Sequence, residues 1–216
     1  MRFVVLLLLA ISGSAWAEPA GPRDTIEEAV TRMVARIEAE RQRLEAEPNY
    51  AREVVREELD GLVDFRRITR LVMADHFNRA SKDQKYAFLD VFKASLINTY
   101  ASGITLYEGQ EIKVLPMAPG DIKGDRARVR TEVQANDGRV VPVFFSLYRN
   151  AGQGWQVENV IVNGLNLGKT FRAQFEQSAQ QYAGDLDQVI ANWSAELDVE
   201  GSVAPAESAT PSPDGA

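Results

Sequence analysis

Cysteine is absent from this sequence, and histidine occurs only once. A chain without cysteine forms no disulfides, offers no thiolate to a metal and lacks the residue at which a bacterial lipoprotein is lipid-anchored. Two motifs are also missing: a serine in a nucleophile elbow, and a glycine-rich phosphate loop followed by a helix. We therefore expect no catalytic centre, no metal site and no cofactor, and a protein that is not an enzyme.

Positive charge is scarce as well. The sequence has 24 lysine and arginine residues against 31 aspartate and glutamate residues, which gives a formal net charge of −7. Nucleic-acid binding needs a basic surface that neutralises phosphates, so this composition argues against nucleic acid as a partner. It argues equally against attachment to anionic lipid through a polybasic segment.

Long hydrophobic runs are limited to the start of the chain. Residues 1–17 contain Arg2, an apolar run over 3–11 and small residues ending at Ala17, a pattern that predicts a secretory signal peptide. The run is too short to span a bilayer as a permanent helix. Export combined with the absence of cysteine is typical of a bacterial periplasm, so we expect a periplasmic protein without a membrane span.

The rest of the chain divides into a domain and a tail. Residues 18–200 are sufficient for a single domain with a sizeable core. Residues 201–216 are rich in proline, serine and alanine, and this composition predicts a disordered tail.

Strand patterns are concentrated in the middle of the domain. We predict a four-stranded antiparallel sheet from the runs at 112–115, 126–134, 140–148 and 155–162. Asp137-Gly138 predicts a hairpin between the second and third runs, because such a turn needs positive φ at its centre. The third run is apolar on both faces, whereas a strand in a small antiparallel sheet normally keeps one face for water. Something must therefore cover both faces.

Helical patterns surround these strands. We predict helices at 24–47, 50–62, 65–77, 81–106, 167–182 and 185–197. Ser81 and Gln84 form a capping box at the start of the longest helix, whose apolar stripe is wider than a third of its circumference. The fold class is α+β, with a helical N-terminal half packed on the sheet and C-terminal helices.

Two segments carry a resemblance to a known family. The first is VDFRRITRLVMADHFNRASKDQKYAFLDVFKASLINTYASGITLYEGQEIKVLP, and the second is GRVVPVFFSLYRNAGQGWQVENVIVNGLNLGKTFRAQFEQSAQQYAGDLDQVIANW. Their order of motifs resembles the MlaC family, also called the toluene-tolerance auxiliary family, over about 63–197. Asn159 and Asn163 depart from the family pattern, which usually has acids there.

The resemblance implies a function and a set of partners. Members resemble periplasmic phospholipid carriers that shuttle lipid between the outer and inner membranes and maintain outer-membrane lipid asymmetry. Such a carrier contacts two membrane complexes transiently: an inner-membrane ABC transporter with an MCE-domain protein, and an outer-membrane lipoprotein complex.

The surplus of apolar surface has two interpretations. The helix stripe packs directly on the sheet and fills the core, or an apolar cleft between the layers holds acyl chains, near the top of the usual ~300–1,000 Å³ range. With the resemblance added, we expect the cleft, with Tyr100 and Tyr107 at its wet rim. The candidate lipid-binding residues are Phe88, Phe92, Leu96, Tyr100, Ile104, Tyr107, Val129, Val133, Val143, Phe145, Leu147 and Val157.

Two other groups of residues support alternative functions. Arg126, Arg128 and Arg130 form a basic row at strand spacing, either a solvated face or the partner-binding surface of a periplasmic adaptor with a filled core. Asp75 and His76 are the pair that a hydrolase would use. Neighbouring residues on a helix do not face one another, which favours a satisfied histidine at a helix end.

Overall fold

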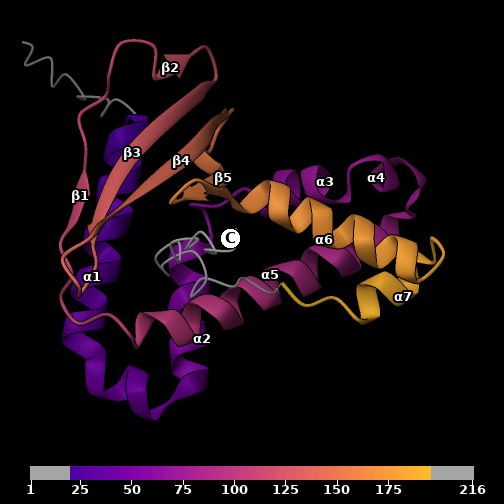
Figure 1. Ribbon diagram of the computed structural model, residues 1–216, viewed down its shortest axis with the longest axis horizontal. Helices are drawn as coiled ribbons and strands as arrows, with labels where there is room; N and C mark the ends of the chain where they lie inside the picture. The colour runs from indigo at the N-terminus through magenta and orange to yellow at the C-terminus, as the bar shows by residue number, and fades with distance from the viewer. Residues whose placement is uncertain (1–19, 196–216) are drawn as a thin grey trace, which may run out of the picture.

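The computed structural model describes residues 20–195 (Figure 1). Its elements are α1 (Pro22–Ala46), α2 (Pro48–Leu59), α3 (Phe65–Met73), α4 (Asp75–Arg79), α5 (Lys82–Ile104), β1 (Ile112–Val114), β2 (Ile122–Lys123), β3 (Arg126–Gln134), β4 (Val140–Asn150), β5 (Gly154–Val162), β6 (Leu165–Asn166), α6 (Leu167–Gln181) and α7 (Leu186–Ala191). The predicted signal peptide at 1–17 and tail at 201–216 lie outside the described residues. No helix within the described range is long and apolar enough to cross a membrane.

The strands form one sheet in the order β1-β3-β4-β5-β6, with β2 paired to β3, and all these pairings are antiparallel. The four predicted strands are present, and β2 and β6 are additional. Each of these two has only two residues, too few to produce a recognisable alternation. The predicted hairpin is also present, with Gly138 at a φ of 82°.

The two faces of the sheet are covered in different ways. On the inner face, Val129 and Leu147 pack against Ile26 of α1. On the outer face, arginine side chains cover the aromatic rings: Arg128 lies 5.9 Å from the ring centre of Phe144, and Arg67 lies 3.8 Å from that of Tyr148. Cation–π contacts with arginine therefore cover these two rings, whereas Val140 on the same face is 56% exposed, so the expected cover of both faces is only partial.

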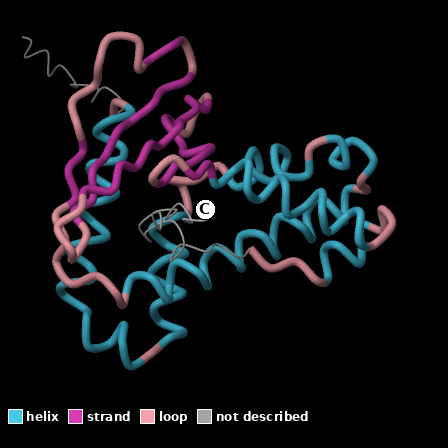
Figure 2. The backbone as a smooth tube through the Cα atoms, in the orientation of Figure 1, coloured by secondary structure: helices cyan, strands magenta, loops and turns pink. Residues whose placement is uncertain are grey.

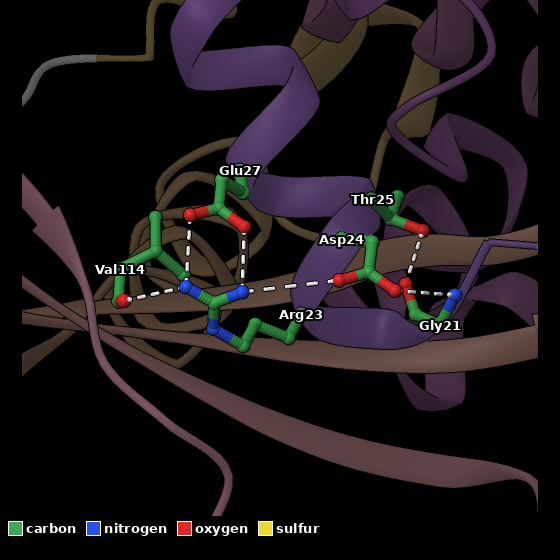
Figure 3. Close-up of polar contacts among 6 residues, drawn as sticks. All are labelled: Gly21, Arg23, Asp24, Thr25, Glu27 and Val114. Atoms are coloured by element: carbon green, nitrogen blue, oxygen red, sulfur yellow. Dashed lines mark hydrogen bonds and ion pairs between the residues drawn. The ribbon is translucent and has the colours of Figure 1, made fainter.

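The N-terminal end of α1 is fixed to the edge of the sheet (Figure 3). Arg23 forms two hydrogen bonds with the carboxylate of Glu27, of 2.6 and 2.8 Å, and also donates to the carbonyl oxygen of Val114 in β1 at 3.3 Å. The helix begins after Gly21, whose N–H donates to Asp24 and whose carbonyl accepts from Thr25. These contacts hold α1 along the inner face of the sheet.

Helices α3, α4, α6 and α7 and the N-terminal part of α5 form a second group away from α1, whereas α2 and the C-terminal part of α5 pack with α1 (Figures 1 and 2). Their core is a cluster of aromatic rings from α5, α6 and the segment after α7. Ring centres lie 4.8 Å apart for Phe88 and Phe175, 5.0 Å for Phe88 and Trp193, and 5.3 Å for Phe92 and Phe171.

Two predicted helices depart most from the structure at their C-terminal ends. The prediction of one helix over 65–77 is wrong, because the chain turns at Ala74, which has a φ of 47°. After the turn, His76 packs on Phe175, with ring centres 5.6 Å apart. The last helix ends at Ala191, although Trp193 beyond it is still buried in the core.

Candidate functional site

A cavity of about 280 Å³ lies between the inner face of the sheet and the helices α3, α5 and α6. Its walls are apolar apart from Tyr100, Glu158 and Asn159. The sheet contributes Val143, Phe145, Val157, Val160 and Val162, and the helices and the α2–α3 loop contribute Leu59, Leu62, Val63, Phe65, Ile68, Phe92, Leu96, Leu167 and Phe171. The core is therefore not completely filled, whereas the adaptor alternative requires a filled core. The cavity is also smaller than the expected size near the top of the ~300–1,000 Å³ range.

The wall on the sheet side depends on a β-bulge in β5. Val157 pairs with Leu147, and Asn159 pairs with Ser146, which directly precedes Leu147 in β4. Glu158 therefore lies between two paired residues and has no partner of its own in β4. As a result Val157 and Val160, three residues apart, both reach the cavity. Glu158 turns to Arg67 of α3, with which it forms an ion pair.

Backbone bonds connect the helical layer to the same strand. Val157 donates to the carbonyl of Leu62 at 2.8 Å, and its own carbonyl accepts from the N–H of Asp64 at 3.0 Å. Asp64 then caps α3 by accepting from the N–H of Arg67. The loop before α3 therefore behaves as a short additional strand, and it positions Phe65 and Ile68 over the cavity.

Asn159 and Gly168 close the wall at the start of α6. The Asn159 side-chain oxygen accepts a hydrogen bond from the Gly168 N–H at 2.9 Å. A Cβ atom on residue 168 would lie 2.7 Å from that oxygen, closer than real Cβ contacts allow. The asparagine that departs from the family pattern therefore connects β5 to α6, and the close approach requires glycine.

Half of the candidate lipid-binding residues line this cavity: Phe92, Leu96, Tyr100, Val143, Phe145 and Val157. The other half lie elsewhere. Phe88 is in the aromatic cluster, Ile104 and Tyr107 pack with α1 and α2, Val129 and Leu147 lie under α1, and Val133 pairs with Ile112 of β1. Their role in lipid binding stays a prediction.

Sequence reasoning missed the contributions of α3, α6 and the α2–α3 loop. The residues that line the cavity follow helical spacing within each helix: Phe65 and Ile68 in α3, and Leu167 and Phe171 in α6. This spacing is the signal that the sequence offers. That signal identifies a buried face, but it does not say whether a neighbouring side chain or a cavity lies beyond it.

The predicted basic row on β3 is present but is partly neutralised. Arg130 lies 3.4 Å from the carboxylate of Asp121, and Arg126 lies 4.0 Å from that of Glu158. Arg128 extends over the outer face of the sheet and is exposed. Partner binding by these three arginines stays a prediction.

The Asp75/His76 pair is not arranged as a catalytic dyad. The His76 Nε2 atom lies 2.9 Å from Glu176, and its Nδ1 atom lies 3.0 Å from a guanidinium nitrogen of Arg79. Both ring nitrogens are therefore engaged by residues other than Asp75, and His76 does not line the cavity. Within residues 20–195, no three residues of the types His, Cys, Asp and Glu are grouped so as to hold a metal ion.

The hydrogen bond from His76 lowers the pKa of Glu176 below its ordinary value of 4.5, with a further contribution from Gln180. We expect the His76→Phe variant to raise the pKa of Glu176 back towards 4.5, which carbon-detected NMR titration would measure. A pKa that stays low in the variant would show that the histidine is not its cause. The Asp75→Asn variant is the control and should leave the pKa of Glu176 unchanged.

Fold and cavity together define an α+β protein with an apolar pocket between its helical layer and its sheet. A family model described as MlaC protein matches residues 27–195. The toluene tolerance protein ttg2D of Pseudomonas putida is 33% identical over 198 residues, which cover 91% of each chain. The chain therefore belongs to the MlaC family, and the prediction made from its residues is confirmed.

Two further comparisons agree with this assignment. The intermembrane phospholipid transport system binding protein MlaC of Haemophilus influenzae is 24% identical over 165 residues, covering 76% of each chain. A solved phospholipid-binding protein from Ralstonia solanacearum, in complex with a phospholipid, matches with a TM-score of 0.71 at 24% identity. The match covers 80% of this chain and 94% of that one, and it confirms the predicted α+β fold class.

Proposed function

We propose that this protein is a periplasmic phospholipid carrier that moves lipid between the outer and inner membranes and holds acyl chains in the cavity. The observation that carries the proposal is the cavity itself, which is lined almost entirely by apolar side chains. Membership of the MlaC family and the names of the relatives support it. The protein acts by binding and release and is not an enzyme.

The energetics of transfer favour an apolar pocket with weak contacts to the headgroup. Each buried methylene is worth about 0.8 kcal/mol, so two chains with some thirty methylenes represent roughly 25 kcal/mol against water. The donor membrane offers the same burial, so transfer into a matching pocket is close to neutral. Tight capture of the headgroup would slow release, and we therefore place it at the mouth, near solvent.

The size of the cavity adds a condition. About 280 Å³ is less than the ~300–1,000 Å³ that usually encloses a drug-sized ligand, so two complete chains need more room. Loading therefore requires the helical layer and the sheet to move apart. The hydrogen bonds of Val157 to the α2–α3 loop and of Asn159 to α6 define where the two layers are joined.

The partners follow from the carrier function. Lipid would be exchanged with an outer-membrane lipoprotein complex and with an inner-membrane ABC transporter that carries an MCE-domain protein. The exposed Arg128 and its neighbours on the outer face of the sheet are the candidate surface for acidic parts of these complexes.

Mass spectrometry of the gently purified protein tests the proposal. We expect about one phospholipid per chain to survive purification and to be released by denaturation. Extraction of the unfolded protein mixed with the same membranes serves as the control for carry-over. A protein that is free of lipid after expression and also takes up none from vesicles would refute the carrier function.

A further inference from the structure

Three side chains on α5 define the direction of the cavity. Phe92, Leu96 and Tyr100 recur every four residues and all line it. Their exposed fractions rise from 0% to 6% and then to 38%. Eight residues of α-helix span about 12 Å, so over this distance the cavity changes from a closed end at Phe92 to an open end at Tyr100.

Tyr100 is also the only member of this stripe with a polar group. Its hydroxyl makes no hydrogen bond with any residue in the part of the chain that the structure describes. A phenol with the ordinary pKa of 10.0 is already a neutral donor at physiological pH, and burial raises the pKa of Tyr100 further. Tyr100 lines the cavity and is 38% exposed, so this residue lies where the cavity opens to solvent.

Loading changes the surroundings of this hydroxyl. Because Tyr100 is partly exposed, water can hydrate the hydroxyl while the cavity is empty. Acyl chains that enter the cavity displace that water, and a buried hydroxyl without a partner then opposes binding. The lipid must therefore bring an acceptor to this position if binding is to remain favourable.

The acceptor follows from the direction of the cavity. An acyl chain that enters with its methyl end towards Phe92 has its head end at the opening, next to Tyr100. The first polar group at the head end of such a chain is the carbonyl of its ester bond to glycerol. A carbonyl oxygen is an acceptor without a donor, and it complements a hydroxyl that has no other partner.

We propose that the Tyr100 hydroxyl donates a hydrogen bond to the ester carbonyl of a bound acyl chain, so that the protein selects ester-linked over ether-linked lipids. This inference rests on the proposed carrier function and names the part of the lipid that the site recognises. Tyr100 is then a specificity-determining residue, whereas the apolar walls accept either linkage.

A competition between two lipids tests the inference. Lipid-free protein is incubated with vesicles that contain equal amounts of diacyl and dialkyl phosphatidylglycerol with the same chain lengths. The protein is repurified, and the ratio of the two bound lipids is measured by mass spectrometry. We expect about a fivefold excess of the diacyl form, the size of one neutral hydrogen bond.

Two variants with the same chemical change separate the site from its surroundings. Tyr100→Phe should lower the ratio to about one, with bound dialkyl lipid rising at the expense of the diacyl form, because the variant has no hydroxyl left unpaired by the ether. Tyr107→Phe is the matched control, because Tyr107 lies seven residues further on, packs with α1 and α2 and does not line the cavity. It should keep the wild-type ratio.

An infrared spectrum gives an independent readout. The ester carbonyl band of diacyl lipid bound to the wild-type protein should include a component at lower frequency, as expected for a hydrogen-bonded carbonyl. This component should be absent in Tyr100→Phe and present in Tyr107→Phe.

The possible results are distinct. Equal binding of both lipids by the wild-type protein overturns the inference and leaves the carrier function intact. The same applies if Tyr100→Phe reduces both lipids alike, because the tyrosine would then only support the shape of the cavity. Failure to bind either lipid would refute the carrier function, and the inference with it.

Discussion

Replacing Phe145 by aspartate should abolish lipid retention and leave the protein folded. Phe145 lies on β4 with its side chain in the cavity wall, and it is only half-buried. In the empty variant, water in the cavity hydrates the new carboxylate. In the loaded variant, acyl chains expel that water, so the desolvation penalty falls on the complex and not on the empty fold.

The size of the effect has an upper limit set by protonation. A carboxyl group with an ordinary pKa of about 3.9 is neutralised at pH 7 at a cost of about 4 kcal/mol. A complex that meets this cost would bind lipid about a thousandfold more weakly. We therefore expect no measurable lipid after repurification from vesicles, with the secondary structure retained in circular dichroism spectra.

Phe144→Asp is the matched control. Phe144 is the neighbouring residue on the same strand, but it lies on the outer face under Arg128 and does not line the cavity. The control variant should keep its lipid. Loss of lipid in both variants would mean that damage to the sheet, and not charge in the cavity, is responsible.

The dependence on pH provides a second check. Contact with acyl chains raises the pKa of the introduced carboxyl group, because burial disfavours the charged form. Lipid retention by Phe145→Asp is therefore lost above that pKa and should recover as the pH falls towards about 4. Retention by Phe144→Asp should not depend on pH over this range. If Phe145→Asp does not recover its lipid at low pH, the desolvation argument is contradicted.

The sequence predicted most of the fold because its signals are local. Alternation over 126–134, the Asp137-Gly138 turn and the capping box of Ser81 and Gln84 each involve residues that are close in the chain. All three are present in the structure, and the capping box has hydrogen bonds of 3.0 and 3.1 Å. The turn at Ala74 was not predictable, since alanine has no preference for positive φ.

The sequence predicted that an apolar cavity lies between the helices and the sheet, but it did not predict which residues line that cavity. Phe88 and Phe92 are one turn apart on the same stripe, yet only Phe92 lines it. Helical periodicity identifies their shared face, whereas the distance and angle between α5 and the sheet decide which of them meets a void. The bulge at Glu158 has a similar origin, because it depends on how β5 pairs with β4.

This difference between Phe88 and Phe92 leads to the second large expected effect. Phe88→Ala should lower the free energy of unfolding by about 3–5 kcal/mol, the usual loss when a buried phenylalanine is truncated. The Phe88 side chain is fully buried and contacts Phe175 and Trp193 edge-on, so three structural segments lose contacts at once. Urea denaturation at constant pH would measure the change.

The lipid content distinguishes this variant from the cavity variants. Since Phe88 lies behind the closed end of the cavity and not in its wall, the fraction of folded Phe88→Ala protein that retains lipid should equal that of the wild type. Tyr86→Ala, on the exposed side of the same helix with 49% of the residue accessible, should change the free energy of unfolding by less than about 0.5 kcal/mol. A stable Phe88→Ala protein that had lost its lipid would show that the aromatic cluster belongs to the binding site after all. A stability loss as large in Tyr86→Ala would show that the cost does not come from the core.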